Sequence, residues 1–568
     1  MRRFTAALPL LGMTALTLFS GCASVRQAAS GDSPPSYRID VAPVAHPQGE
    51  TPAWWYRNGA ARAAANGAMG GKAKNVILFL GDGMSLTTVA AARILDGQRK
   101  GQPGEENLLS WERFPHTAFS KTYNTDSQTP DSAGTMTAIA SGVKTHMGAI
   151  GVSSGSRDDC ADSLAKPLLN WLQLADSAGL ATGIVSTARM THATPAAMYA
   201  YSPDRNWEND TDLPPEAVAQ GCTDIAQQLL TASRFGRGPD VFLGGGRGEF
   251  TSVEQRDPEY DDKVGQRLDG RDLTAEWLGA NPQGAYVWNS EQLRAHKDAP
   301  RLLGLFEPDH MQFEHERPQD PAGEPSLAEL TRVAIENLSR NADGYVLMVE
   351  AARIDHANHY GNAYRALDET IAMSEAVQAA IDATSREDTL IIVTADHSHT
   401  LNFVGYPVRG NPILGKVRGQ GSEDDTPGDY ARDQAGLTYT TLSYANGPGY
   451  TGASNQQPAG PKRHLHAPSS VESSDGRPDL SHVDTEHPDY LQEALVPLKS
   501  ESHGGDDVGI WAIGPGSAAV RGTVEQNVIY HFIVQATPKL RQRLCAAGTC
   551  NADGVPVELP KPADFQSR

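Results

Sequence analysis

Three short apolar runs, each closely followed by an acidic residue, constrain the fold of this chain more than any other feature. They are residues 76–80 followed by Asp82, residues 345–349 followed by Glu350, and residues 390–393 followed by Asp396. Runs that are apolar on both faces and separated by helical stretches are typical of buried strands in a mostly parallel sheet. The sequence therefore predicts an α/β fold, in which a large, mainly parallel sheet is sandwiched between helices.

The three acidic residues are expected to lie close together. Ligands of such sheets gather at the carboxyl ends of the strands, where Asp82, Glu350 and Asp396 emerge. Three uncompensated carboxylates cannot share one site, and the histidines beside them make metal ions the expected cations. Taken singly, each acid has another interpretation, because an Asp after a strand often caps the next helix.

Further metal-ligating side chains flank these acids. Asp355 and His359 are four residues apart and would share one face of a helical turn. His397 directly follows Asp396, and His503 lies in a Gly-rich turn before a predicted strand at residues 508–513. Mixed imidazole and carboxylate ligands suit zinc, whereas an all-oxygen set suits magnesium.

A candidate nucleophile lies in the segment at residues 129–137. Pro130 and Asp131 indicate a helix start, which places Ser132 at the helix N-terminus. Unpaired N–H groups there bind anions such as phosphate. The alternative is that Ser132 only caps the helix.

The first 22 residues predict an export signal. Arg2 and Arg3 precede an apolar stretch at residues 6–19 and the small residues before Cys22, and the stretch is too short for a permanent anchor. The ending resembles a bacterial lipoprotein cleavage box, in which Cys22 is lipidated; ordinary cleavage into a soluble periplasmic protein is the alternative. Residues 23–74 are rich in Ala, Gly, Pro and Ser and predict a tether followed by an N-terminal arm.

Four further cysteines predict two disulfides in an exported protein. Cys545 and Cys550 are close enough to close a small loop, which leaves Cys160 to pair with Cys222. A metal site formed by these cysteines is poorly supported, because no two of them have the CxxC spacing.

The charge balance excludes one class of function. The net charge is −21, and no run of Lys and Arg is present, so a nucleic-acid binder is not expected.

Six ordered motifs together resemble the alkaline phosphatase family, and most closely its animal, tissue-type branch. They are Asp82-Gly-Met, Asp131-Ser-Ala-Gly, His192-Ala-Thr-Pro, Glu350 through His359, Thr394-Ala-Asp-His-Ser-His and His503-Gly-Gly-Asp-Asp. The resemblance implies a catalytic domain over residues 75–550, a crown-like insertion at about residues 405–499, a C-terminal tail at residues 551–568, and a homodimer.

The resemblance also implies a role for each matching residue. Asp355, His359 and His503 match the ligands of the family's first zinc. Asp82, Asp396 and His397 match those of its second zinc, which Ser132 would approach. Asp82, Thr194 and Glu350 match the ligands of its magnesium. Arg205 matches the phosphate-clamping arginine, and His192, His356 and His399 would orient ligands. A calcium site would fall on Glu259, the Phe306 carbonyl, Glu307 and Glu324, although a solvated acidic cluster is an alternative.

The expected activity is therefore the hydrolysis of a broad range of phosphate monoesters through a phosphoserine on Ser132. Each of three alternative functions predicts a different residue pattern. A phosphodiesterase of the same superfamily usually has Thr as nucleophile and lacks the magnesium site marked by Thr194 and Glu350. A sulfatase needs a C/S-x-P-x-R segment, which Ser132-Ala-Gly-Thr lacks. A non-catalytic surface lipoprotein that binds phosphate or metal predicts the loss of a catalytic residue, and none is missing.

Overall fold

The structure is a computed structural model that describes residues 37, 39–44, 47–154, 159–419, 428–433, 435–451, 453–454, 460–464, 471–473 and 477–567. The predicted export signal and Cys22 lie outside this part of the chain. Within the described residues, every helix is too short or too polar to cross a membrane.

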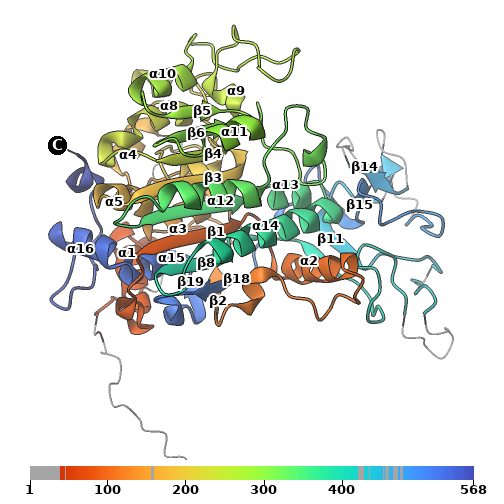
Figure 1. Cartoon of the computed structure of the whole chain (residues 1–568). Helices are drawn as coiled ribbons and strands as arrows, with labels where there is room; N and C mark the ends of the chain where they lie inside the picture. Colours follow the sequence, from red (N-terminus) through yellow and green to blue (C-terminus); the bar gives the residue numbers. More distant parts are fainter. Residues whose placement is uncertain are drawn as a thin grey trace, which may run out of the picture. The chain divides into compact units, whose positions relative to one another are not determined.

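A ten-stranded sheet organises the chain (Figure 1). In spatial order its strands are β19 (Gly522–Glu525), β2 (His116–Lys121), β18 (Val508–Ile513), β8 (Thr389–Ala395), β1 (Asn75–Gly81), β7 (Tyr345–Ala351), β3 (Ala181–Arg189), β4 (Val241–Gly245), β6 (Leu302–Leu305) and β5 (Ala285–Val287). All neighbouring pairs are parallel except those of β18, which is antiparallel to β2 and to β8. The predicted α/β fold with a mainly parallel sheet is confirmed.

The central strand β1 shows why the apolar runs are continuous. Val76, Leu78 and Leu80 point into the hydrophobic core on one side of the sheet, while Ile77 and Phe79 point into the core on the other side. Successive side chains of a strand alternate between its two faces, so a strand covered on both faces needs apolar residues at every position.

Helices cover both faces of the sheet (Figure 1). Core residues on one face come from α2 (Leu86–Arg99), α12 (Leu327–Leu338) and α14 (Ala363–Ala383). Those on the other face come from α1 (Pro52–Ala65), α3 (Ser132–Ser141), α5 (Trp171–Ser177), α15 (Val528–Ala536) and α16 (Pro538–Ala546). Shorter helices are α4 (Cys160–Ala165), α6 (Ala193–Ala196), α7 (Pro215–Ala219), α8 (Ile225–Gln228), α9 (Arg247–Phe250), α10 (Leu273–Ala280), α11 (Ser290–His296) and α13 (Arg353–His359).

Segments before residue 75 and after residue 550 also contribute buried residues. The predicted N-terminal arm includes α1, which contacts α15 and buries Trp55 and Tyr56. The predicted tail buries Val555, Val557 and Phe565. The sequence pattern of α1 is weak because much of its buried face is Ala and Gly rather than large apolar residues.

The insertion at residues 405–499 contributes short strands to three small sheets. One sheet joins β10 (Leu401–Phe403), β11 (Leu442–Gly447) and β16 (Ala494–Pro497); the others pair β12 (Ala453–Ser454) with β14 (Val471–Ser473) and β13 (Lys462–Arg463) with β15 (Tyr490–Leu491). A further pair, β9 (Ser398–His399) with β17 (His503–Gly504), brings His503 opposite His399.

Both predicted disulfides are confirmed. Cys160 is bonded to Cys222, and Cys545 is bonded to Cys550.

Candidate metal centre and nucleophile

Three neighbouring strands bring the predicted acids together. The strands β8, β1 and β7 are adjacent and parallel, and their register places Gly81 beside both Ala351 and Ala395. Asp82, Glu350 and Asp396 therefore emerge at the same edge of the sheet, as the sequence predicts. All three side chains are fully buried.

A first cluster surrounds the Ser132 hydroxyl. His397 Nε2 lies 3.3 Å from both Asp82 Oδ1 and Asp396 Oδ2. Ser132 Oγ lies 3.1 Å from His397 Nε2 and 3.4 Å from Asp82 Oδ1. Ligand atoms about 2.0–2.1 Å from a tetrahedral ion are about 3.4 Å from one another, so this spacing fits a shared metal ion.

A second cluster contains Asp355, His359 and His503. The Nε2 atoms of the two histidines are 3.1 Å apart. Each of them lies 3.4 Å from a carboxylate oxygen of Asp355. Asp355 and His359 project from α13, one helical turn apart, as their spacing predicts. Two imidazole nitrogens and a carboxylate at these distances again fit the ligands of one ion.

A third group lies around Glu350. Thr194 Oγ1 is 3.5 Å from Asp82 Oδ2, and Ser186 Oγ donates to Glu350 Oε2 at 2.5 Å. Glu350 Oε1 is buried and has no hydrogen-bond partner among the described residues. A buried carboxylate oxygen without a hydrogen-bond partner is normally compensated by a cation or an ordered water molecule, so this group of oxygen atoms also fits a metal ion. Ser186 was missed from the sequence, although β3 pairs with β7 and places Ser186 beside Glu350.

The electrostatics of these carboxyl groups require positive charge. Burial, together with the neighbouring carboxylates, raises the pKa of Asp82 well above its usual value. Burial also raises the pKa of Asp396, and it raises the pKa of Glu350 to about 7. Buried carboxylates of this kind ionise only when cations compensate them, which metal ions would do.

Ser132 begins helix α3, as the sequence predicts. Asp131 caps this helix, with its Oδ1 accepting from the Gly134 N–H at 3.1 Å. The buried Ser132 side chain therefore stands at the positive end of the helix, where free N–H groups attract anions.

Arg205 is held beside this helix start. Its Nη1 donates to Asp131 Oδ2 at 3.3 Å, and its Nη2 lies 3.0 Å from His192 Nε2. These two contacts fix the plane of the guanidinium, which leaves its other hydrogens for an anion.

His399 lies between two carboxylates. Its Nε2 is 2.6 Å from Asp355 Oδ1, and its Nδ1 bonds to Glu501. Burial alone would lower the pKa of His399, but Glu501 and Asp355 outweigh it and raise the pKa to about 10. With both ring nitrogens engaged, His399 is suited to orient Asp355 rather than to bind an ion. Glu501 was missed because only the β9–β17 pairing brings its segment to His399.

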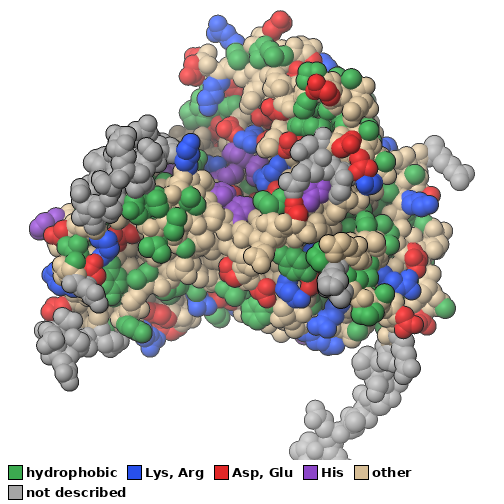
Figure 2. All heavy atoms as spheres, turned by 180° about the vertical axis from the view of Figure 1, so that it is seen from behind, with side chains coloured by type: hydrophobic (Ala, Val, Ile, Leu, Met, Phe, Trp, Pro, Cys, Tyr) green, Lys and Arg blue, Asp and Glu red, His purple; other side chains and the backbone are tan. Residues whose placement is uncertain are grey.

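His192 and His356 join a third histidine, His310, that the sequence analysis also missed. Ligand nitrogens of all three lie within 4.8 Å of one another. However, one ring nitrogen of each predicted histidine already contacts an arginine side chain. Arg205 contacts His192, and Arg353 contacts His356. This cationic surrounding disfavours a further metal ion here. Figure 2 shows histidine side chains gathered in a hollow on one face, with basic and acidic side chains around them.

The predicted calcium ligands are only partly brought together. Carboxylate oxygens of Glu259, Glu307 and Asp320 lie within 4.8 Å of one another. Glu324 is not in that group, and its Oε2 accepts from the Gln312 N–H at 3.0 Å. Asp320 was missed from the sequence because it belongs to a loop without a recognisable pattern.

Comparisons with known proteins agree with this geometry. The family model described as alkaline phosphatase matches residues 73–538. The human tissue-nonspecific isozyme of alkaline phosphatase is 42% identical over 473 residues, covering 82% of this chain and 83% of the relative. An alkaline phosphatase of Gadus morhua is 42% identical over 475 residues, covering 82% and 92%.

Solved structures of similar fold include a Thermus thermophilus alkaline phosphatase, with a TM-score of 0.57 and 25% identity over 84% of this chain and 96% of that one. The alkaline phosphatase of the Antarctic bacterium TAB5 has a TM-score of 0.53 and 20% identity, covering 82% and 99%, which supports the fold alone.

Proposed function

Because this chain belongs to the alkaline phosphatase family and is therefore a metal-dependent phosphate monoester hydrolase, we propose that it acts through a phosphoserine formed on Ser132. The observation that carries this proposal is the position of Ser132 Oγ, 3.1 Å from His397 Nε2 at the start of α3. A hydroxyl group is thus held within a cluster of metal-ligating atoms and at the positive end of a helix. Arg205 is anchored to Asp131, the residue that directly precedes Ser132.

Two zinc ions and one magnesium ion complete the proposed site. Asp355, His359 and His503 would hold one zinc, Asp82, Asp396 and His397 the other, and Asp82, Thr194 and Glu350 the magnesium. When bound, these ions lower the pKa of nearby hydroxyl groups and stabilise the departing ester oxygen. Calcium is a further proposal, with Glu259, the Phe306 carbonyl and Glu307 as its ligands and with Asp320, whose carboxylate groups with those of Glu259 and Glu307, in place of Glu324.

The residues of the chain then act in two steps. Deprotonated Ser132 Oγ attacks phosphorus in line, and the bond between phosphorus and the ester oxygen breaks, which leaves a phosphoserine. Water then attacks the phosphorus of this intermediate from the vacated side, the bond between phosphorus and Ser132 Oγ breaks, and inorganic phosphate leaves while the serine is restored. Arg205 and the first N–H groups of α3 hold the equatorial phosphate oxygens throughout. Since recognition centres on the phosphoryl group, we expect a broad range of monoesters to react.

The test compares hydrolysis of p-nitrophenyl phosphate and its bis-ester by the wild type and by Ser132→Ala, with added zinc and magnesium and after chelation. Monoester turnover should require metal and should fall by about 10³-fold or more in Ser132→Ala, because the nucleophile is lost. The matched control is Ser141→Ala, in the last turn of the same helix, where the hydroxyl donates only to Thr137 O. This control should keep its activity.

The same assay distinguishes the remaining alternatives. Preference for the bis-ester would move the assignment to the phosphodiesterases of the superfamily. A folded, metal-loaded wild type that hydrolyses neither ester would instead support a phosphate- or metal-binding lipoprotein.

We further propose a homodimer that uses the crown-like insertion. Phe403, Tyr406, Leu495 and Val496 lie on or next to the β10–β11–β16 sheet with 43%, 88%, 78% and 48% of their surface exposed. Exposed apolar groups of this size favour an interface. Light scattering should report a dimer for the wild type and a monomer for a Tyr406→Asp/Leu495→Asp variant.

Export to the periplasm, or anchoring to a bacterial membrane through lipid on Cys22, is also proposed. The two disulfides support an oxidising compartment. Palmitate labelling of the wild type but not of Cys22→Ala is the expected result for a lipid anchor.

A further inference from the structure

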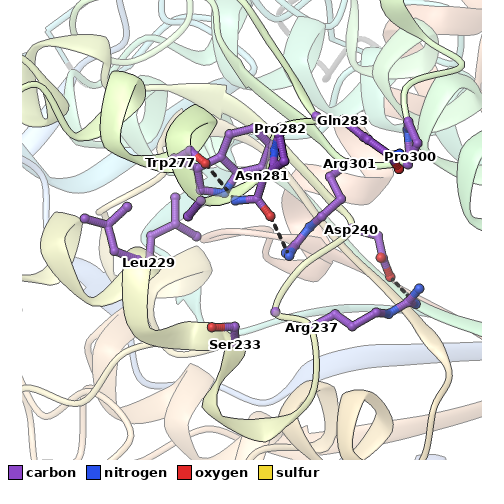
Figure 3. A pocket seen from close by; sticks show the side chains of 14 residues that line it. Leu229, Ser233, Arg237, Asp240, Trp277, Asn281, Pro282, Gln283, Pro300 and Arg301 are labelled. Atoms are coloured by element: carbon purple, nitrogen blue, oxygen red, sulfur yellow. Dashed lines mark hydrogen bonds and ion pairs between the residues drawn. The ribbon is translucent and has the colours of Figure 1, made fainter.

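The buried carboxylate of Asp396 is held in place without a basic side chain. Asp396 directly follows β8 and is fully buried, and within the described residues no Lys or Arg forms an ion pair with it. Asp240, another buried aspartate at the end of a strand, shows the contrasting arrangement, because its Oδ2 pairs with Arg237 Nη2 at 3.1 Å (Figure 3). The orientation of the Asp396 side chain therefore depends on neutral hydrogen-bond donors.

Main-chain donors fix only one of the two carboxylate oxygens of Asp396. Its Oδ1 accepts from the Gly83 N–H at 3.0 Å and from the His397 N–H at 2.8 Å. Gln526 Nε2 donates to the main-chain oxygen of Asp396 at 2.5 Å. The Asp82 side chain also lies against Asp396, but two ionised carboxylates repel each other. These contacts leave the direction of Oδ2 to be set by another donor.

Thr135 supplies that donor from the helix that carries Ser132. Its Oγ1 donates to Asp396 Oδ2 at 3.1 Å, and the side chain is fully buried. In the described part of the chain no other hydroxyl group donates to this carboxylate. Thr135 follows Ser132 by three residues in α3, so both side chains lie on the same face of the helix. The hydroxyl group thus connects the helix of the proposed nucleophile with a proposed metal ligand.

The hydroxyl hydrogen of Thr135 has two other acceptors within reach. Thr135 Oγ1 lies 2.9 Å from Asp131 O and 3.1 Å from Ser132 O. Asp131 O already accepts the N–H of Thr135 at 3.1 Å. A bond to an ionised carboxylate is about twice as strong as one to a neutral carbonyl, so the hydrogen goes to Asp396. The alternative is that Thr135 only bonds back to its own helix.

We propose that Thr135 is a positioning residue, whose hydroxyl group directs Asp396 Oδ2 toward the ion beside Ser132. With Oδ1 occupied by main-chain donors and Oδ2 held by Thr135, the remaining lone pair of Oδ2 faces His397 Nε2 at 3.3 Å. Side chains that orient a ligand in this way typically change metal affinity about 10- to 100-fold. The inference rests on the proposed function, because it takes Asp396 as a zinc ligand and Ser132 as the nucleophile.

Chelator competition tests this role without a measurement of turnover. The zinc-loaded protein, with magnesium in excess, is titrated with a chromophoric chelator that takes up the zinc ions in order of their affinity. Thr135→Val keeps nearly the same shape but lacks the hydroxyl group, so one of the two zinc ions should be bound about 10- to 100-fold more weakly. The other zinc ion, proposed on Asp355, His359 and His503, should keep its affinity.

Three further variants assign the effect to the hydroxyl group. Thr135→Ser retains the donor and should hold both zinc ions like the wild type, whereas the smaller Thr135→Ala should behave like Thr135→Val. The matched control is Thr331→Val in α12. The buried Thr331 hydroxyl group donates to Leu327 O at 2.7 Å, the same bond to the preceding helical turn, and its loss should leave both zinc affinities unchanged.

The dependence of turnover on zinc gives a second readout. Thr135→Val should need about 10- to 100-fold more free zinc than the wild type for half of its maximal hydrolysis of p-nitrophenyl phosphate. Thr135→Ser and Thr331→Val should follow the zinc dependence of the wild type.

Wild-type affinity for both zinc ions in Thr135→Val and Thr135→Ala would overturn the inference, and so would an equal loss of affinity in Thr135→Ser. Failure of the proposed function has a different signature. A wild type that holds no zinc, or a Ser132→Ala variant that keeps its turnover, would contradict that function whatever the Thr135 variants show.

Discussion

At the scale of single residues, Asp82 joins two of the proposed ion sites. Its Oδ1 lies 3.3 Å from His397 Nε2 and faces Ser132, whereas its Oδ2 lies 3.5 Å from Thr194 Oγ1. The two oxygens of one carboxylate thus face different clusters. A change in the ion at either cluster is expected to alter the charge that the other cluster experiences.

The contacts of Arg205 lead to a prediction about phosphate binding. Arg205→Lys replaces a planar fork by a single ammonium group, which cannot hold two phosphate oxygens in one plane. We expect kcat/KM for p-nitrophenyl phosphate to fall about 10- to 100-fold and inhibition by inorganic phosphate to weaken in parallel. The control Arg271→Lys alters a surface arginine paired with Glu276 and should leave both quantities unchanged. Unaltered phosphate inhibition in Arg205→Lys would contradict the proposed role.

Glu369 in α14 predicts a pH dependence of stability. Burial raises its pKa to about 8, despite a hydrogen bond from the Glu314 N–H. In the folded protein the Glu369 carboxyl therefore keeps its proton up to about pH 8, whereas in the unfolded chain it loses the proton near pH 4.5. The contribution of Glu369 to the free energy of unfolding therefore decreases as the pH rises from about 4.5 through 8. The substitution Glu369→Gln should change the free energy of unfolding in the stabilising direction by about 1–3 kcal/mol more at pH 9 than at pH 5.

Thermal melts of the wild type and Glu369→Gln at the two pH values measure this effect. The exposed Glu336, paired with Lys297, supplies the control Glu336→Gln, which should retain the pH dependence of the wild type. An identical pH dependence in the wild type and Glu369→Gln would show that Glu369 does not carry a proton in the folded protein.

At the scale of elements, the contact between α1 and α15 depends on the absence of a side chain at one position. A Cβ at Gly59 would lie 2.5 Å from His531 Cδ2 and 2.9 Å from Asn527 Nδ2. In contrast, a Cβ at Gly279 in α10 would meet nothing within 4 Å. Both glycines are helical, so their substitution separates the intrinsic preference of a helix for Ala from the tightness of packing.

The two substitutions should change stability in opposite directions. Gly279→Ala should stabilise the protein by up to about 1 kcal/mol, because Ala is the better helix former. Gly59→Ala should destabilise it by about 1–3 kcal/mol, because α1 must move away from α15. Denaturant unfolding measures both, and a stabilising Gly59→Ala would mean that the two helices are packed more loosely than the structure shows.

The sequence predicted the elements whose patterns are local. The strands β1, β7, β8 and β18, the start of α3 and the turn that joins Asp355 to His359 all follow from short-range periodicity and capping. The family motifs supplied the proposed ligand set. Helix α1 was missed because much of its buried face consists of the small residues Ala and Gly. Ser186, Glu501 and His310 were missed because strand pairing and loop packing bring them to their partners. No local pattern records a contact of that kind.

At the scale of the whole molecule, the Cys160–Cys222 disulfide closes a long loop that contains β3, Thr194 and Arg205. The two cysteines are 62 residues apart, whereas Cys545 and Cys550 are separated by 5. In the chain-entropy account, a cross-link stabilises by about 4 kcal/mol for the longer loop and by about 2 kcal/mol for the shorter one.

Paired serine variants test this difference. Cys160→Ser/Cys222→Ser should lose more stability than Cys545→Ser/Cys550→Ser in denaturant unfolding. It should also lose monoester turnover at lower denaturant concentrations, since its loop carries proposed site residues. Equal losses of stability in the two variants would contradict the loop-length argument.

The position of β1 in the sheet also bears on how the chain reaches its folded state. Val76 of this first strand pairs with Val346 on one side and with Leu390 on the other. Both edges of β1 therefore stay unpaired until more than half of the polypeptide has been synthesised. Because contacts of such large sequence separation form slowly, the sheet is expected to assemble only after synthesis is nearly complete. A chain that stays unfolded for that long remains available for transport across a membrane as an extended polypeptide, and must be kept from aggregating on the way.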